Sequence, residues 1–423
     1  MMMVHIFFKQ KTKIQCGKMH YNLSSNACSI KQPIVSFLNE TLTNEKINYC
    51  FANLEQLNIE WVEIRSCRME DITMHYLLTK LLAYQVKRLS IHSQTLSNLS
   101  INHLTNLLNS EHCLIKLKLE NVIFENFVSF FQQFSNFSLE ILEIQDCPTI
   151  SKHHLRILIE NLNFNCLQEL TLSELSLGDD FMQIFGANLQ DRGRNELKVL
   201  RLVECDLSDE ELLLFGSFFS QNLFNFLEEL DLSSNQFLEE SFLQLCEALR
   251  IKRFGALRKL FFAECGLTDA CLLELSQSLP YSKITLLYLE SNRFTSASVI
   301  NGLLKLGVEN TLTMESIYLD ENIEIIDISE ALFLNSIRNH PRLSVFSLEG
   351  TNVSDALKIK IDQLLSFQQN LNVRIVVLFC ALLNSNKIED SCSSSSVSKK
   401  LDKDHFKLLL NLKIIKLLAL FLI

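Results

Sequence analysis

The chain has 423 residues, of which 48% are hydrophobic, and a formal net charge of −10 at pH 7. With only 10 Gly and 4 Pro, most of it can bury apolar surface and little of it has the composition of a linker. The acidic balance argues against nucleic-acid binding, because a protein that coats nucleic acid needs a basic face to displace counterions from the phosphates. Thirteen cysteines without a CxxC pair argue against a disulfide framework and a tetrathiolate zinc site, so we expect a reducing, cytoplasmic location.

The first 53 residues contain no copy of the repeat found further along the chain. They begin with "MMMVHIFFKQKTK", which has no basic residues before its apolar run and no small-residue cleavage site, and is therefore a poor signal peptide. Their one amphipathic stretch is "PIVSFLNETLTNEKI". Because a stack of repeats leaves its first core edge exposed, we predict that residues 1–53 form a helical cap over that edge.

A repeated pattern, LxxLxLxx(C/N)xL, occupies residues 54–383. Its clearest copies are "LKVLRLVECDL", "LEELDLSSNQF", "LRKLFFAECGL" and "ITLLYLESNRF". Successive copies begin 25 to 30 residues apart, a regularity that indicates a stack of similar structural units. The twelve copies begin at Ile59, Val86, Leu114, Leu139, Leu167, Leu197, Leu227, Leu257, Ile284, Met314, Leu343 and Val373.

Each part of the pattern predicts a structural role. The LxL alternation is that of a short strand, and strands of successive repeats can pair as a parallel sheet. The Cys or Asn three residues after the last Leu, such as Cys205 or Asn235, lies where the chain turns and buried backbone groups need a compact polar or thiol neighbour. A helix follows, because Ser208 and Glu211 form a capping-box pattern ahead of an apolar helical face. We therefore predict an α/β solenoid of about 12 repeats, with a parallel sheet on its concave face and helices on its convex face.

The helix-containing repeat resembles the ribonuclease-inhibitor class of leucine-rich repeats, which also occurs in NOD-like receptors and in Ran GTPase-activating proteins. The resemblance rests on the alternation of "LRKLFFAECGLTDACLLELSQSL" with "LEELDLSSNQFLEESFLQLCEAL", including second cysteines at Cys271 and Cys246 on the helix. It implies a horseshoe-shaped solenoid. A narrower run, "LYLESNRFTSASVINGLLKL" followed by "ENTLTMESIYLDEN" and "NHPRLSVFSL", is similar to the tropomodulin and leiomodin repeat domain, which caps actin filament ends.

Two further segments follow the repeats. Residues 384–404 are polar and Ser-rich, which is typical of a flexible linker. Residues 405–423 are largely apolar, but Lys413 and Lys416 would each cost about 2.5 to 3.5 kcal/mol on membrane insertion, and the apolar run is shorter than the roughly 20 residues that span a bilayer. Three interpretations stay open: membrane contact, which these costs disfavour, an apolar tail that docks on the solenoid or a partner, and an unreliable chain end.

The sequence contains no catalytic or cofactor motif that we recognise. The patterns GxxxxGK[ST], GxGxxG, HExxH and GxSxG do not occur, and no Cys/His spacing is typical of a metal site. Adjacent His153 and His154 would point about 100° apart on a helix, so we interpret them as a solvated pair. Cysteines at the turn position are interpreted as small buried residues. We predict that the protein is not an enzyme and holds no cofactor or metal.

The residue between the last two apolar anchors of each repeat should face solvent. In five consecutive repeats it is Arg201, Asp231, Phe261, Tyr288 and Tyr318. Because adjacent strands lie about 4.8 Å apart, the three aromatic residues would form a continuous exposed ladder. Exposed aromatic residues are common anchors of binding hot spots, although rings stacked on neighbouring strands can equally serve only to stabilise the sheet.

Acidic residues recur at the two positions that follow the last Leu. Like charges at strand spacing repel each other, so this column is either a solvated face or a surface that steers a basic partner toward the sheet. Its members are Glu120, Asp146, Glu174, Glu204, Glu264, Glu290, Asp320, Glu321 and Glu349.

We therefore expect a non-catalytic interaction scaffold that binds a protein partner with a basic surface and does not bind nucleic acid. The alternatives implied by the two resemblances are a regulator of a small GTPase, like the Ran GTPase-activating proteins, and a regulator of actin filament ends, like tropomodulin. The predicted partner-binding residues are Phe261, Tyr288, Tyr318, Asp231, Glu264, Glu290, Asp320 and Glu321.

Overall fold

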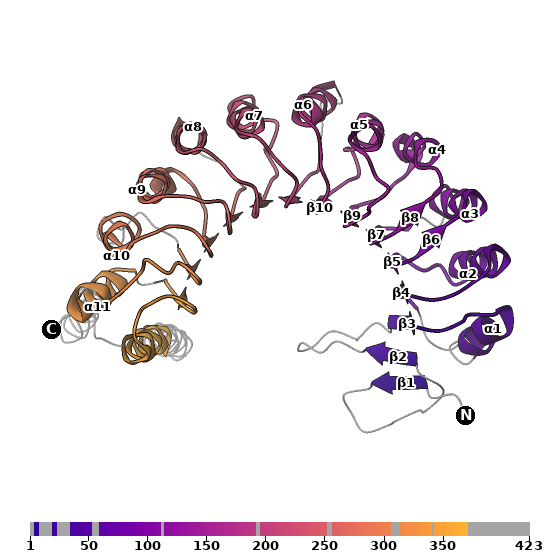
Figure 1. Ribbon diagram of the computed structural model, residues 1–423, viewed down its shortest axis with the longest axis horizontal. Coiled ribbons are helices and arrows are strands. Elements are labelled where there is room, and N and C mark those ends of the chain that lie inside the picture. Colours follow the sequence, from indigo (N-terminus) through magenta and orange to yellow (C-terminus); the bar gives the residue numbers. More distant parts are fainter. Residues whose placement is uncertain are drawn as a thin grey trace, which may run out of the picture. The chain divides into compact units, whose positions relative to one another are not determined.

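A computed structural model describes residues 4–7, 19–22, 34–52, 59–110, 114–191, 195–251, 256–305, 314–327, 329–340 and 342–370. By its internal contacts the chain divides into two units, Met1–Ser366 and Phe367–Ile423. The first unit contains all the labelled strands and helices (Figure 1).

Twelve strands form one continuous parallel sheet, in which the order along the sheet follows the order along the chain. The predicted α/β class with a long parallel sheet is confirmed. The strands are β3 (Ile34–Leu38), β4 (Trp61–Arg65), β5 (Arg88–His92), β7 (Lys116–Glu120), β9 (Ile141–Gln145), β10 (Glu169–Ser173), β11 (Val199–Val203), β12 (Glu229–Asp231), β13 (Lys259–Phe261), β14 (Leu286–Tyr288), β15 (Ser316–Tyr318) and β16 (Val345–Ser347).

The sheet continues beyond β3 with two short strands. Strand β2 (Met19–Asn22) is antiparallel to β3, and β1 (Val4–Phe7) is parallel to β2. A separate pair, β6 (Thr95–Leu96) and β8 (Ile123–Phe124), joins two of the connections that leave the main sheet.

Helical segments connect the strands, and all of them lie on the same side of the sheet (Figure 1). No described segment covers the opposite side, which we call the open face. The helical segments are α1 (Asn44–Ala52), α2 (Asp71–Ala83), α3 (Asn98–Leu108), α4 (Val128–Phe131), η1 (Phe134–Asn136), α5 (Lys152–Asn161), α6 (Phe181–Asp191), α7 (Asp209–Ser220), α8 (Glu239–Ile251), α9 (Asp269–Ser278), η2 (Leu279–Tyr281), α10 (Ser296–Ser298), η3 (Val299–Leu303), α11 (Glu330–Arg338) and a last helix over residues 355–370.

The core lies between the sheet and the helices. Alternate residues of each strand point toward the helices, and the two anchors of a strand, such as Leu200 and Leu202, are fully buried. Phenylalanines fill the wider parts of this space, with Phe130 and Phe134 packed edge to face at 5.2 Å between ring centroids. Because each repeat contributes one strand and one or more helical segments, a single repeat cannot bury its own apolar face.

The chain turns in the same way after each of the twelve strands. The residue two positions after the second buried anchor of each repeat, such as Leu202 or Leu232, has a φ between 45° and 67°, a left-handed conformation that favours glycine. Eleven of the twelve residues at this position are not glycine, and they include Glu264 and Glu321. The predicted acidic positions are therefore partly turn positions.

The predicted role of the Cys and Asn residues beside this turn is confirmed. The Cys205 thiol donates hydrogen bonds to the carbonyls of Leu172 (3.2 Å) and Val203 (3.3 Å). The Asn235 amide accepts hydrogen bonds from the backbone N–H groups of Cys205 (3.0 Å) and Leu207 (3.1 Å) and donates to the Leu202 carbonyl (2.8 Å). These bonds pair buried backbone groups of adjacent repeats, which would otherwise cost about 1–3 kcal/mol each.

The predicted capping box at α7 is also present. The Ser208 hydroxyl accepts from the Glu211 N–H (3.4 Å), and the Glu211 carboxylate accepts from the Ser208 N–H (2.8 Å). The helix therefore begins where the sequence predicts.

The predicted helical cap needs correction at its amphipathic stretch. Ile34–Leu38 of that stretch is strand β3, paired in register with β4, and only Asn44–Ala52 is helical. Val35 and Phe37 are fully buried, as the anchors of the later strands are. The stretch is therefore a further strand-and-helix unit of the same kind.

Several expectations fall on residues that the structure does not describe. They are the twelfth copy of the repeat at Val373, the Ser-rich linker 384–404 and the apolar segment 405–423. Among the described residues, none of the helices has the length and apolar character needed to cross a membrane.

Candidate functional site

The structure brings the three predicted aromatic residues together on the open face. Strand register places Phe261 opposite Tyr288, and Tyr288 opposite Tyr318. The Phe261 and Tyr288 rings stack at 4.5 Å between centroids and 8° between planes, and the Tyr288 and Tyr318 rings stack at 4.1 Å and 1°. We call this set the ring ladder. All three side chains are partly exposed, so the ladder presents the edges of its rings to solvent.

Tyr288, the central ring, has an altered acidity. Burial raises its pKa to about 12, assisted by a hydrogen bond with Tyr318 and by nearby carboxylates. Its hydroxyl is therefore protonated at any physiological pH, so Tyr288 offers a partner a neutral hydroxyl group.

Carboxylates border the ring ladder at the carboxyl ends of its strands. The predicted acidic column separates here into two rows, because one set lies at the strand end and the other in the left-handed turn. Burial raises the pKa of Glu290, and the nearby charges of Asp320 and Glu264 raise it further. We call the following set the acidic rim: Glu264, Glu290, Asp320, Glu321 and Glu349.

The acidic rim is not neutralised within the described part of the chain. None of its five carboxylates forms an ion pair with a described residue. Glu264 and Glu349 are exposed, and Asp320 accepts one hydrogen bond, from the Glu349 N–H at 2.7 Å. Among the described residues, the rim therefore carries carboxylates without an ion-pair partner beside partly exposed rings.

Asp231 differs from the other predicted site residues. It stands in register with Phe261, but its carboxylate accepts a hydrogen bond from the Ser233 N–H at 3.0 Å, and burial raises its pKa. Beside it, the nearly buried Glu229 accepts from Arg201 (2.7 Å) and Lys259 (3.0 Å). Asp231 therefore belongs to a locally neutralised part of the face.

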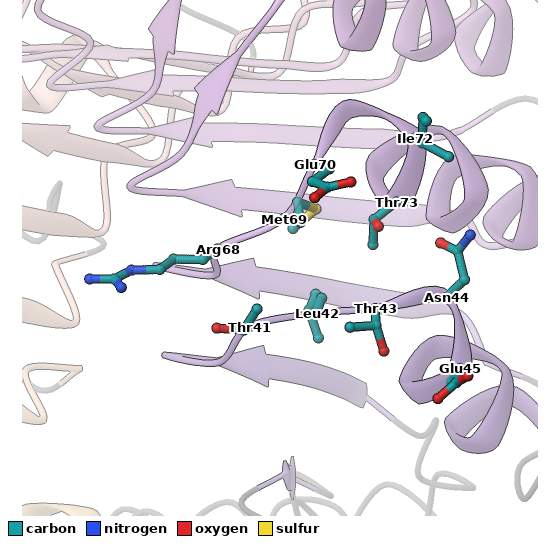
Figure 2. Close-up of a pocket in the computed structure, with 10 residues that line it drawn as sticks. All are labelled: Thr41, Leu42, Thr43, Asn44, Glu45, Arg68, Met69, Glu70, Ile72 and Thr73. Atoms are coloured by element: carbon teal, nitrogen blue, oxygen red, sulfur yellow. The ribbon is translucent and has the colours of Figure 1, made fainter.

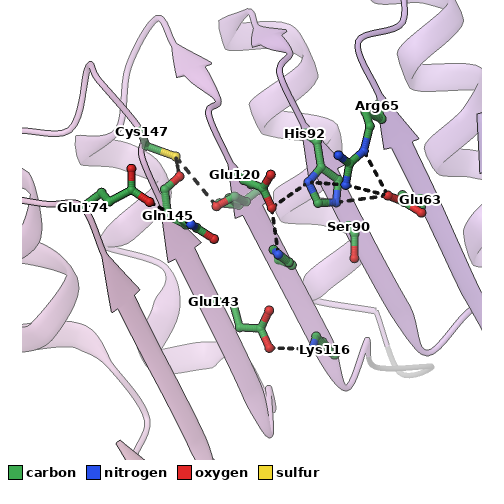
Figure 3. Close-up of polar contacts among 12 residues, drawn as sticks. Glu63, Arg65, Ser90, His92, Lys116, Glu120, Glu143, Gln145, Cys147 and Glu174 are labelled. Atoms are coloured by element: carbon green, nitrogen blue, oxygen red, sulfur yellow. Dashed lines mark hydrogen bonds and ion pairs between the residues drawn. The ribbon is translucent and has the colours of Figure 1, made fainter. Parts of the chain in front are cut away.

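The open face has the opposite character near β4 to β9 (Figure 3). His92, only 4% exposed, lies 3.5 Å from the Glu63 carboxylate and 3.0 Å from that of Glu120. Lys118 lies 2.8 Å from Glu120, and Arg65 lies 3.1 Å from Glu63. The acidic residue Glu120 of the predicted column is therefore paired here, and we did not predict this network from the sequence.

The signal for this network was present in the sequence but lay at positions that we did not compare. Glu63 and Lys118 occupy the same strand position as the rings of the ladder, and Arg65, His92 and Glu120 occupy the position two residues later. Comparing both positions across all strands would have shown that opposite charges alternate near β4 to β9, whereas the charged residues near β14 to β16 are all acidic.

Two of the pockets in the described part of the chain lie at turns beside the sheet, and one of them includes Glu264 of the acidic rim. One is bordered by the turns that lead into α1 and α2, where the Leu42 N–H donates to the Arg68 carbonyl, and Figure 2 shows ten residues that line it. The Arg68 side chain extends away from those helices. The other pocket lies at the turns after β11 to β14 and is lined by Glu204, Ser234, Gln236, Glu264, Gly266, Ser291 and Arg293. Both pockets are open to solvent and mainly lined by turn residues.

The described residues contain no group of three or more metal-ligating side chains that could hold an ion. The turn cysteines are poor nucleophiles, because burial raises the pKa of Cys147 to about 11 and those of Cys205 and Cys265 to about 12. The thiolate is the reactive form. Reactive chemistry at these thiols is therefore disfavoured.

The fold and this face together define an α/β repeat protein with one long parallel sheet, helices on one side and an open face on the other. The sequence matches no protein-family model, and no curated protein is significantly similar to it. The argument for function therefore rests on the face itself.

Proposed function

We propose that the protein is a leucine-rich-repeat solenoid of the ribonuclease-inhibitor class that works as a non-catalytic scaffold. It binds a protein partner with a basic surface on the ring ladder and the acidic rim. The observation that carries this proposal is the combination of three stacked, partly exposed rings with five carboxylates that form no ion pair among the described residues.

The energetics favour a binding role over a purely structural one. Cross-strand aromatic pairs contribute roughly 0.2–1 kcal/mol each, so the two stacked pairs stabilise the sheet modestly. The acidic rim acts in the other direction, because like charges at strand spacing destabilise the sheet. A basic partner would relieve that repulsion and would be drawn toward the face by its field.

The ladder can be tested by truncation. We expect the F261A/Y288A/Y318A variant to lose at least about tenfold in affinity for the partner, because buried aromatic anchors commonly contribute more than 1 kcal/mol each. The partner is first captured with the native protein, identified, and then titrated against both proteins by isothermal titration calorimetry. Equal affinity of the two proteins would contradict the assignment of the site.

A matched control removes exposed aromatic residues elsewhere. Phe226 and Tyr281 are 50% and 51% exposed and lie outside the open face. The F226A/Y281A variant should bind the partner as the native protein does, and circular dichroism should show all three proteins equally folded. A catalytic role would be indicated if the chain accelerated GTP hydrolysis by a small GTPase, and that result would contradict the non-catalytic scaffold.

A further inference from the structure

The ring ladder has two ends, and they differ. Stacking at 4.1 and 4.5 Å closes both faces of Tyr288 and one face each of Phe261 and Tyr318. Two ring faces remain, the one that Phe261 turns toward β12 and the one that Tyr318 turns toward β16. Only these two faces could accept a further flat group in the same stack.

The neighbour on the β12 side leaves little reason for a ligand to bind there. The residue in register with Phe261 is Asp231, which is held by the Ser233 N–H and borders the Arg201–Glu229–Lys259 ion pairs. The cationic side chains of Arg201 and Lys259 therefore already lie beside this end of the ladder, where a cationic ligand would otherwise bind.

The neighbour on the β16 side is small. The residue in register with Tyr318 is Ser347, a partly exposed side chain that does not reach the height of a tyrosine ring above the sheet. Among the described residues no strand lies beyond β16, and neighbouring strands lie about 4.8 Å apart, so a flat group stacked on the outer face of Tyr318 would lie above Ser347. We call this space the Ser347 slot.

Carboxylates lie two residues beyond the slot on both of the strands that form it. Asp320 follows Tyr318 along the chain, and Glu349 follows Ser347. Asp320 accepts the Glu349 N–H, which places the two residues side by side, and neither forms an ion pair with another described residue. The slot thus combines an open aromatic face with two carboxylates, which together suit a flat cation that donates several hydrogen bonds.

We propose that the Ser347 slot receives an arginine side chain of the partner. The guanidinium stacks on the outer face of Tyr318 above Ser347 and donates hydrogen bonds to Asp320 and Glu349. This inference rests on the proposed function and specifies the chemistry of the partner. Arginine fits better than lysine, because its planar group stacks on an aromatic face and donates in a fork that matches carboxylates, whereas an ammonium group does neither.

The test uses two peptides of equal charge, acetylated hexa-arginine and hexa-lysine, titrated into the full chain by calorimetry. We expect hexa-arginine to bind at least about fivefold more tightly, which is the order expected for one stacked, doubly hydrogen-bonded cation. Equal affinities for the two peptides would overturn the proposal, because net charge alone would then explain the binding.

Variants locate the effect. Ser347→Phe extends the ladder by one ring and fills the slot, so it should remove the preference for arginine, whereas Tyr318→Phe keeps the ring face and should retain it. Asp320→Asn is a second variant with no added volume and should weaken hexa-arginine about threefold or more. A matched control, Glu204→Gln, removes a carboxylate outside the acidic rim. If S347F keeps the full preference while D320N and E204Q act alike, the slot is not the site.

The two proposals fail in different ways. If the F261A/Y288A/Y318A variant loses its partner but the native chain shows no preference between the peptides, the scaffold function stands and the arginine slot does not. If that variant keeps its partner, the ring ladder is not the binding face, whatever the peptides show.

Discussion

Single residues in this protein perform a shared task with different chemistry. At the turn position, a thiol in Cys265 and an amide in Asn292 both bond the backbone of the preceding repeat, through the Leu232 and Phe262 carbonyls respectively. The amide does more, because it also accepts from the N–H groups of Cys265 and Leu267. The sequence predicts that this position is buried and polar, but the identity of each partner follows only from the stacking of the repeats.

His340 allows a prediction about pH. It is 3% exposed, its Nε2 atom lies 2.9 Å from the Leu304 carbonyl oxygen, and burial lowers its pKa below the ordinary value of 6.5. A lowered pKa in the folded state means that the unfolded state binds more protons in mildly acidic solution. The stability that the buried, neutral His340 contributes is therefore present above pH 6.5 and is lost as the pH falls from there toward the folded-state pKa.

We expect the free energy of unfolding of the native protein to fall between pH 7 and pH 5 more steeply than that of the His340→Gln variant. The difference in slope is bounded by about 1.4 kcal/mol per pH unit, the limit for one proton. Urea titrations at each pH measure it. Parallel pH profiles for the two proteins would show that His340 does not titrate differently on unfolding.

At the scale of the elements, the alternation of the LxL segment predicts the position of every strand from β4 to β16 in the main sheet. Strand β3 was missed because its unit has Gln32 where the other copies have an apolar first anchor and Glu40 where most of them have Cys or Asn. The buried residues Val35, Phe37 and Leu42 keep the pattern. A few buried apolar residues are enough for a strand when the neighbouring strand β4 supplies the hydrogen bonds, and comparison with the repeat pattern alone does not take that pairing into account.

Two glycines, Gly186 and Gly216, stand at equivalent positions of α6 and α7 but meet different neighbours. A Cβ added at Gly186 would overlap the ring of Phe218, which is 5% exposed and lies on the next helix. A Cβ added at Gly216 would lie 3.4 Å from the Ala248 Cβ, an ordinary contact. The first glycine is therefore required by packing and the second is not.

We expect Gly186→Ala to lower the free energy of unfolding by about 1–3 kcal/mol, the usual cost of overpacking. Gly216→Ala is the matched control and should be neutral or stabilising by up to about 1 kcal/mol, because alanine favours the helix. Chemical denaturation of both variants measures the difference. A G186A protein as stable as G216A would mean that α6 and α7 can move apart at no cost.

At the scale of the whole molecule, the candidate site was predicted better in its rings than in its charges. Strand register follows directly from the repeat, so Phe261, Tyr288 and Tyr318 had to meet if the sheet formed. Which acids stay unpaired depends on charged neighbours in the adjacent repeat and on the same strand, as Glu120 shows by pairing with His92 and Lys118 respectively. Comparing one strand position across the repeats cannot reveal which acids are paired.

A stack of repeats also predicts how the molecule opens. Each repeat contacts only its neighbours, so a terminal repeat has fewer stabilising interfaces than a central one. Cys50 lies on α1, the first of the described helices, which packs against α2. Cys205 lies at the turn after β11, in the middle of the sheet. Both are buried, at 2% and 0% exposure.

We therefore expect Cys50 to react with iodoacetamide several-fold sooner than Cys205 at denaturant concentrations below the unfolding midpoint, as measured by peptide mass spectrometry. Cys166, which is partly exposed, serves as the control that reacts in the native state. Cys205 reacts only when the central repeats open, because both its burial and its pKa of about 12 suppress the thiolate. If Cys50 and Cys205 reacted at one common rate, the sheet would open as a single cooperative unit, and stability would not be graded along the stack.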